Sequence, residues 1–318
     1  MYIISTREIK DGAWTYFKAE DDQPRFFGIV DPAKLNPGDL RDLGDPPGAV
    51  ETIVAEAKKL MPSSPMVLVF AHGYNNTVPT AVSTAIEIGT ALDARQVMPA
   101  MGALCWSTDG KLENYLQDRS DARASDLVVS RALLQFAGHP DIASGAVAFN
   151  LLSHSMGNYL MDVACEAMGT HQPLPLRLFR NSILVAADIN RDDLNTGQEG
   201  DLRCRLSDRV TFYYDGWDGT LAIAEFLLHR QRFGQLGPHH WDELYPNTIG
   251  VSCTDVIRAH THDPIEGAWD VGVNIHSGYF GEPKFYDDLA QVLQGISPAE
   301  ITTRRQPAGS PTNAYRLQ

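Results

Sequence analysis

Short apolar runs alternate along the chain with stretches whose apolar residues recur at helical spacing. The run Met66–Phe70 is apolar throughout, as expected of a strand covered on both faces. Ala146–Leu152 is a further buried strand, apolar except for Asn150, and the residues from Leu160 to Met168 behind it keep the period of a helix. Further short strands are predicted at 103–106, 182–187, 210–214 and 248–253. Strands that alternate with helices predict an α/β protein with a mostly parallel central sheet and helices on both faces.

The two ends of the chain depart from this alternation. Segments rich in β-formers, at 2–9 and 14–19, flank Asp11-Gly12, a strong turn signal, and predict an N-terminal β-hairpin. From Ser297 onward Pro, Ser, Thr and Gln accumulate without periodicity, which is typical of a loose tail. We therefore expect a β extension over 1–48, packed on a single α/β domain over 49–296, and a flexible tail over 297–318.

Composition and charge narrow the classes of partner. The chain has 318 residues, 43% hydrophobic, with 40 acidic against 26 basic residues and a net charge of −14. Such a surface repels nucleic-acid phosphates and anionic lipid, so we expect neither partner. No run approaches the about 18 apolar residues of a membrane span, and the N-terminus does not read as a signal peptide. Four widely spaced cysteines without a CxxC pair favour a reducing, cytoplasmic compartment.

The segment SHSMG, residues 153–157, lies between a predicted buried strand and a predicted helix. In a nucleophile elbow a serine occupies a strained turn at this place, and small residues must stand two positions to either side. Ser153 and Gly157 meet that condition, so Ser155 is the candidate nucleophile. A serine-rich helix N-cap would explain the five residues alone, but their place between strand and helix favours the elbow.

Acyl transfer develops negative charge on a carbonyl oxygen, and two backbone N–H groups must point at that oxygen. One would come from Met156, at the positive end of the helix that follows the nucleophile. The other would come from the loop after the strand 66–70, which reads His72-Gly73-Tyr74-Asn75. We expect the N–H of Tyr74 to serve, with that of Asn75 as the alternative.

The serine also needs a general base and an acid that orients it. Histidine titrates in the range that suits a base, and His276 lies on a loop before the predicted C-terminal helix. His72 and His154 flank the site and are expected to hold loop geometry. Asp218 and Asp188 both end predicted strands, and the chain order Ser–acid–His permits either as the acid. We favour Asp218, which follows the predicted strand 210–214, because an architecture of this kind usually carries its acid after the seventh strand. Asp188 would then line the pocket.

These motifs resemble the α/β-hydrolase superfamily, and within it a bacterial family with an HGYN loop, a tryptophan-containing fourth strand and an HSMGN elbow. The matching residues run in order along the chain: His72–Asn75, Cys105-Trp106-Ser107, His154–Asn158, Ala187-Asp188-Ile189 and His276–Tyr279. The family pattern has Trp-Pro-Ser where this chain has Trp106-Ser107-Thr108, so the loop there is expected to differ in shape. The resemblance implies an α/β-hydrolase fold and a serine-hydrolase site, and it supplies no substrate.

We therefore expect a serine hydrolase that cleaves a carboxylic ester, or a related acyl bond, of a small molecule through an acyl-enzyme. No cofactor and no metal are expected, and the sequence does not determine the oligomeric state. Esters are favoured because their leaving group needs the least protonation. His72, Asn75, Trp106 and Trp217 are the candidate substrate contacts.

Two other classes compete with this interpretation. An α/β-hydrolase fold can serve as a non-catalytic binding module, although the presence of all three triad residue types argues against this. A metal hydrolase would use His260, His262 and Asp263, but that run lacks a second cluster at ligand spacing. No phosphate-binding glycine motif follows a predicted strand.

Overall fold

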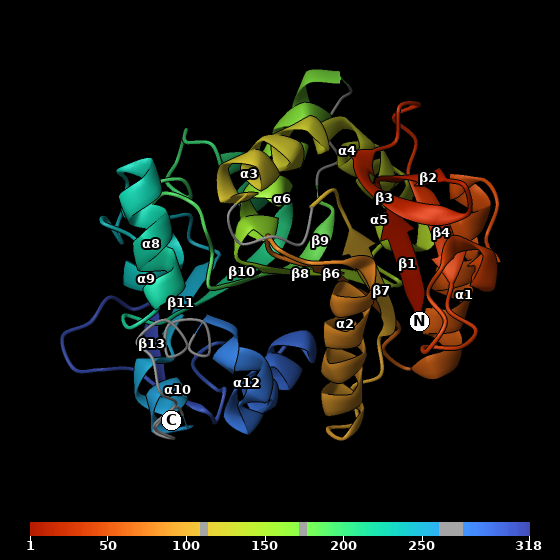
Figure 1. Ribbon diagram of the computed structural model, residues 1–318. Coiled ribbons are helices and arrows are strands. Elements are labelled where there is room, and N and C mark those ends of the chain that lie inside the picture. The colour runs from red at the N-terminus through yellow and green to blue at the C-terminus, as the bar shows by residue number, and fades with distance from the viewer. Residues whose placement is uncertain (109–113, 172–176, 261–275) are drawn as a thin grey trace.

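The computed structural model describes residues 1–108, 114–171, 177–260 and 276–318. Within these ranges one large sheet has the strand order β12-β13-β11-β10-β9-β8-β6-β7-β1-β4-β5 (Figure 1). In that order the strands are Arg304–Arg305, Ala314–Leu317, Thr248–Ser252, Ser207–Tyr214, Phe179–Val185, Ala148–His154, Met66–Ala71, Ala100–Cys105, Tyr2–Ser5, Arg25–Gly28 and Arg41–Asp42. A separate hairpin pairs β2 (Arg7–Lys10) with β3 (Ala13–Lys18).

The central strands run parallel and the edges run antiparallel. From β13 through β1 every neighbouring pair is parallel, whereas β4, β5 and β12 pair antiparallel at the two edges. The apolar run of β6 is buried at every position, because helices cover both faces of the sheet there. The predicted α/β class with a mostly parallel sheet is confirmed.

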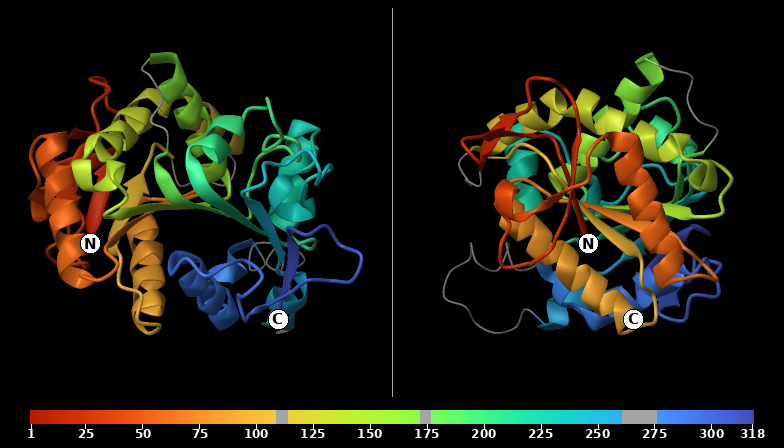
Figure 2. Two further views of the ribbon diagram at one scale, coloured as in Figure 1. Left: turned by 180° about the vertical axis from the view of Figure 1, so that it is seen from behind. Right: turned by 90° about the vertical axis from the view of Figure 1, so that its right-hand side faces the viewer.

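Two helical layers cover the sheet (Figure 2). One apolar core contains residues of α1, α3, α4 and α6, and a second contains residues of α2, α10 and α12. In chain order the helices are α1 (Pro46–Leu60), α2 (Val78–Asp93), α3 (Tyr115–Ala124), α4 (Asp126–Gly138), α5 (Pro140–Ala143), α6 (Met156–His171), α7 (Asp201–Arg205), α8 (Gly219–Leu228), α9 (Phe233–Leu236), α10 (Thr254–His260) and α12 (Pro283–Leu293), with short 3-10 turns at Pro37–Asp39 and Gly278–Gly281. In the ranges that the structure describes, none of the helices combines the length and the apolar character needed to cross a membrane.

The N-terminal segment forms the predicted hairpin but divides its first strand. Tyr2–Ser5 leaves the hairpin and enters the main sheet as β1, parallel to β7. The reason is its apolar sequence, since all four of its residues are buried. Arg7–Lys10, which is polar and more exposed toward its end, pairs with β3 instead.

The expectation of a flexible tail over 297–318 is wrong for its last residues. Ala314–Leu317 forms β13, which pairs parallel to β11, and Arg304–Arg305 pairs with it as β12. Burial of Tyr315 and Leu317 stabilises this edge. A strand of four residues is too short for its alternation to stand out from the surrounding Pro, Ser and Thr.

Candidate active site

Ser155 lies in a sharp turn between β8 and α6, at the carboxyl edge of the sheet. Its φ is 52°, a left-handed conformation that costs a non-glycine residue energy. The turn is held by bonds to the Ser155 backbone: its N–H donates to the carbonyl of Val185 at 3.0 Å, and its carbonyl accepts from the N–H groups of Asn158 at 3.0 Å and Asp188 at 3.2 Å. Strain that is held by surrounding bonds in this way is typical of functional sites.

Two glycines allow the elbow to pack against the loop after β6. A Cβ on Gly157 would lie 2.5 Å from the carbonyl oxygens of Ala71 and His72. A Cβ on Gly73 would lie 2.8 Å from the Cβ of Ser155. Neither distance is possible for a real side chain, so both positions require glycine.

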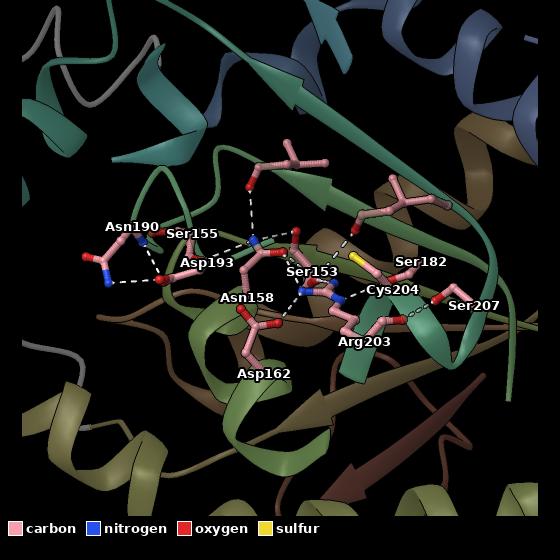
Figure 3. A network of polar contacts seen from close by, with 12 residues as sticks. Ser153, Ser155, Asn158, Asp162, Ser182, Asn190, Asp193, Arg203, Cys204 and Ser207 are labelled. Atoms are coloured by element: carbon pink, nitrogen blue, oxygen red, sulfur yellow. Dashed lines mark hydrogen bonds and ion pairs between the residues drawn. The ribbon is translucent and has the colours of Figure 1, made fainter. Parts of the chain in front are cut away.

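Ser153 replaces the usual first glycine of the elbow and belongs to a buried polar network (Figure 3). Its hydroxyl donates to the side-chain oxygen of Asn158 at 2.7 Å. The amide nitrogen of Asn158 donates to the carbonyls of Ser153 at 3.0 Å and Ser155 at 3.1 Å. Asn158 therefore links the first and third residues of the elbow.

A buried arginine, Arg203, donates hydrogen bonds to this network. Arg203 of α7 donates to Ser182 Oγ at 2.7 Å, to Asn158 Oδ1 at 3.1 Å and also to Ser153 Oγ. Asp162 lies 3.4 Å from the same guanidinium. Burial raises the pKa of Asp162 to about 7, although the charge of Arg203 opposes that shift.

His276 and Asp218 are bonded to each other. His276 Nδ1 lies 2.7 Å from Asp218 Oδ2, and both side chains are buried. The other oxygen of Asp218 accepts from the N–H of Leu221 at 2.9 Å and caps α8. Within the described residues His276 Nε2 has no hydrogen-bond partner. Burial alone would lower the pKa of His276, but the charge and hydrogen bond of Asp218, helped by Asp188, raise it above 6.5.

Asp188, the alternative acid, belongs to a different network. Its Oδ2 accepts from the hydroxyl of Tyr115 at 2.7 Å, and its Oδ1 lies 3.3 Å from the guanidinium of Arg232. Its backbone N–H bonds the carbonyl of Ser155. Asp188 therefore contacts the elbow backbone, whereas the bond to His276 comes from Asp218.

The backbone N–H groups of Tyr74 and Met156 are the two predicted oxyanion donors. Among the described residues the backbone nitrogens of Tyr74 and Met156 donate to no acceptor. The alternative donor, the N–H of Asn75, is occupied, because it donates to Asp118 Oδ2 at 3.1 Å. Asn75 has a φ of 58°, a left-handed conformation, and it lies in residues 72–76 beside the elbow, here called the 72–76 loop.

One cavity of about 390 Å³ lies beside these groups. Its lining includes Ser155 and His276, and of the predicted substrate contacts it includes His72 and Asn75. Phe70, Phe280, Asn76, Thr84 and Glu87 also contribute.

The two predicted tryptophan contacts lie elsewhere. Trp106 is fully buried behind His72, stacks on its ring with centroids 5.4 Å apart, and donates from Nε1 to its carbonyl at 2.8 Å. Trp217 is 57% exposed and does not belong to the described lining of the cavity. In the part of the chain that the structure describes, neither tryptophan lines this cavity, because a residue next to a motif along the chain can point away from it.

His72 and His154 both bond backbone groups of neighbouring loops. Trp106 N donates to His72 Nε2 at 3.3 Å, so the ring is neutral and its Nδ1 donates to the carbonyl of Gly73 at 2.8 Å. His154 Nε2 lies 3.0 Å from the carbonyl oxygen of His276. Burial lowers the pKa of each ring to about 3, and a nearby cation, Arg7 for His72 and His276 for His154, adds to the effect.

The metal alternative falls largely outside the described residues, since His262 and Asp263 lie in the range 261–275. In the parts of the chain that the structure describes, no three His, Cys, Asp or Glu side chains are grouped to hold a metal ion. The four cysteines are buried and unpaired.

Sequence reasoning missed the polar residues that support the site. Arg203 and Arg7 are buried, and nothing in their spacing sets them apart from surface residues. Asn158 carried the best signal, since it follows Gly157 directly in a segment already recognised as an elbow.

The parallel sheet, and the sharp turn that joins β8 to α6 at its carboxyl edge, define an α/β-hydrolase fold. Residues 50–268 match the family described as alpha/beta hydrolase of unknown function (DUF900). This match covers more than half of the chain, and the chain belongs to that family. A comparison with curated proteins found no match.

Several solved structures are similar in fold at low identity. A cutinase-like protein from Cryptococcus sp. is 15% identical, with a TM-score of 0.40, over 74% of this chain and 98% of that one. Lipase B of Aspergillus fumigatus is 11% identical, with a TM-score of 0.42, over 93% and 64%. An acetyl xylan esterase is 14% identical, with a TM-score of 0.36, over 69% and 95%. At these identities the similarities concern the fold alone.

Proposed function

We propose that this protein is a serine hydrolase that cleaves a small carboxylic ester, or a related acyl bond, through an acyl-enzyme. Ser155 is the nucleophile, His276 the general base and Asp218 the acid that orients it. The observation that carries the proposal is the 2.7 Å contact between His276 Nδ1 and Asp218 Oδ2, together with the cavity that His276 and Ser155 both line. Within the described residues His276 Nε2 has no hydrogen-bond partner.

The proposed reaction has two halves. His276 Nε2 accepts the proton of the Ser155 hydroxyl as Oγ attacks the ester carbonyl, and the N–H groups of Tyr74 and Met156 stabilise the oxyanion. Collapse of this intermediate breaks the ester bond, and His276 returns the proton to the leaving alkoxide. Water then attacks the acyl-enzyme, with His276 again as base, and releases the acid.

The cavity fits a small substrate. A volume of about 390 Å³ lies at the low end of ligand pockets, and its lining combines Phe70 and Phe280 with the polar Asn75 and Asn76. A short acyl or aryl ester matches this size and mixed character. Because the chain is acidic, we also propose that its substrate is a small molecule rather than a nucleic acid or a membrane lipid.

Labelling with a fluorophosphonate probe, followed by peptide mapping, tests the proposal. We expect one labelled residue, Ser155, and hydrolysis of p-nitrophenyl acetate by the unlabelled protein. Ser155→Ala should abolish the label and lower kcat about 10⁶-fold, because the triad acts as a unit. Ser144→Ala, a change on the distant α5 side of the molecule, serves as the control.

Two outcomes would contradict the proposal. If a folded protein takes no label and hydrolyses no ester, the alternative of a non-catalytic binding module is favoured. If the label maps to another serine, the assignment of Ser155 is wrong although a hydrolase remains.

A further inference from the structure

Arg7 is a buried cation that the proposed mechanism does not use. Its side chain is 1% exposed, and in the described parts of the chain no carboxylate lies within ion-pair distance of its guanidinium. Burying a charge costs free energy unless strong hydrogen bonds replace its water. The partners of Arg7 therefore indicate what its burial achieves.

Apart from the carbonyl of Thr15 in β3, which accepts from Nη1 at 3.3 Å, those partners lie on two loops beside the candidate site. Arg7 Nη2 donates to the carbonyl of Asn76 at 2.9 Å, and Nη1 donates to the carbonyl of Thr108 at 3.0 Å. Asn76 ends the 72–76 loop after β6, and Thr108 lies in the loop after β7. A planar guanidinium has donors at fixed angles, so one side chain sets the separation of both loops.

The sheet explains why an N-terminal residue reaches this place. β1 runs parallel to β7, with Ser5 opposite Cys105, so the carboxyl ends of both strands meet at one edge of the sheet. The N–H of Thr6 then donates to the carbonyl of Cys105 at 3.1 Å. Arg7, the next residue, thus begins at the edge where the loops after β6 and β7 also begin.

Thr108 joins the two loops a second time. Its hydroxyl accepts from the N–H of Asn76 at 3.2 Å and bonds the Asn76 carbonyl. Arg7 Nη2 also contacts this hydroxyl, at 3.3 Å. The backbone of Asn76 is therefore fixed on both sides by Arg7 and Thr108 together.

Asn76 transmits this position to the proposed oxyanion donor. Its side-chain amide donates to the carbonyls of Tyr74 at 2.9 Å and Gly73 at 3.3 Å. The Gly73 carbonyl and the Tyr74 N–H belong to one planar trans peptide and point in opposite directions. A group that fixes the Gly73 carbonyl therefore also aims the Tyr74 N–H.

We propose that Arg7 is a positioning residue, which through Asn76 holds the 72–76 loop so that the Tyr74 N–H points at the developing oxyanion. This inference rests on the proposed serine-hydrolase function. It also assigns a role to the N-terminal extension, which lies outside the matched family range of residues 50–268.

The test compares Arg7→Met with a matched control, Arg209→Met. Arg209 is less buried than Arg7 but likewise donates to two backbone carbonyls, those of Ile296 and Val292, and it also donates to Asn181 Oδ1. It packs against the distant C-terminal part of the chain. Removing an oxyanion-hole donor lowers kcat by about 10²–10³, and misaiming one should cost less, about 10- to 100-fold. We expect this loss in Arg7→Met with p-nitrophenyl acetate, with KM changed by less than about threefold, because oxyanion contacts strengthen in the transition state.

Arg209→Met should keep its kcat within about twofold of the original protein when rates are normalised to labelled Ser155, because its contacts lie far from the oxyanion. The kcat of Arg7→Lys should lie between those of Arg7→Met and the original protein, since one ammonium keeps the charge but cannot reach both carbonyls. The inference is overturned if folded Arg7→Met has the same kcat as Arg209→Met, or if only its KM differs from that of the original protein.

A double-mutant cycle with Asn76→Ala tests the route. If Arg7 acts through Asn76, the double variant should lose little more kcat than the more damaged single variant. Losses that multiply would mean that the two residues act independently, and would overturn the proposed route.

Amide hydrogen exchange tests the position of the 72–76 loop directly, and it does not require that a variant be active. Peptides that cover residues 70–77 should exchange faster in Arg7→Met than in Arg209→Met, whether or not the protein is an esterase, because the Asn76 carbonyl has lost a partner. Unchanged exchange would overturn the inference. Faster exchange in a protein that takes no label and hydrolyses no ester would instead overturn the proposed function on which it rests. Should Arg7→Met not fold, Thr108→Val removes the shared hydroxyl and is compared in the same way.

Discussion

The two sides of the candidate site are each supported by a buried arginine, but the two arginines are paired differently. Arg203, below the elbow, bonds three side chains and has the carboxylate of Asp162 at 3.4 Å. Arg7, beside the 72–76 loop, bonds backbone carbonyls and one hydroxyl. A side-chain network fixes the residues of the core, whereas carbonyl contacts fix the course of a loop. The comparison indicates that the elbow is held by the domain core and the 72–76 loop by the N-terminal extension.

The largest effect should separate the two aspartates. Asp188 belongs to the elbow side through its bond to the Ser155 carbonyl, and Asp218 bonds His276. Asp218→Asn should lower kcat about 10⁴-fold, because the neutral amide no longer stabilises the imidazolium or its tautomer. It should fold, since an asparagine oxygen still caps α8. Asp188→Asn should lose less activity, measured with p-nitrophenyl acetate on protein shown to be folded by circular dichroism. The reverse ranking would place the acid on the elbow side.

The next effect is on stability. Arg203→Met should lower the free energy of unfolding by about 3–5 kcal/mol, because it leaves the buried Asp162 without its cation. Arg7→Met should cost about 1–3 kcal/mol, since the Asn76 carbonyl keeps its bond to Thr108. Urea unfolding followed by tryptophan fluorescence measures both. Equal losses would remove the distinction between a core network and a loop clamp.

A smaller effect concerns pH on the elbow side. The pKa of Asp162 is raised to about 7 in the folded protein, by burial and by the nearby Asp193 and Glu166, against an ordinary value near 3.8. The folded state therefore binds a proton that the unfolded state releases, and stability falls as pH rises from about 4 to about 7, by at most about 1.4 kcal/mol per pH unit. Asp162→Asn should flatten this part of the stability curve, and Asp208→Asn, in an exposed ion pair, should not. An unchanged slope in Asp162→Asn would mean that the carboxyl stays ionised.

The smallest expected effect concerns the pH at which kcat/KM falls on the acid side, which should not change in Arg7→Met. Catalysis needs neutral His276, so kcat/KM should fall with decreasing pH through the pKa of His276, which lies above 6.5. Asp218 is the main cause that raises this pKa, and Arg7 is not among its causes. In Arg7→Met, kcat/KM should therefore fall with decreasing pH at the same pH as in the original protein, while its maximum value is lower. A fall at a different pH would show that Arg7 acts on the base rather than on the loop.

The sequence by itself determined the fold class and the local motifs. Apolar runs such as Met66–Phe70 predict strands covered on both faces, and the structure contains them. The elbow at Ser155 could also be predicted, because its turn demands small residues at fixed spacing. That demand is local, and local sequence carries it, although the carbonyls that exclude a side chain at Gly157 belong to Ala71 and His72 in the loop after β6.

Tertiary structure alone decided what lies next to what. His276 bonds Asp218, 58 positions away, and Asp188 instead contacts Arg232. Chain order had left open which of the two aspartates pairs with the histidine. Tertiary structure also buried Trp106 behind His72 instead of in the cavity and paired Ala314–Leu317 with β11. It also brought Arg7 to Asn76, 69 positions away. Such contacts depend on the order of strands in the sheet, because that order determines which loops share an edge, and no periodicity in the sequence encodes it.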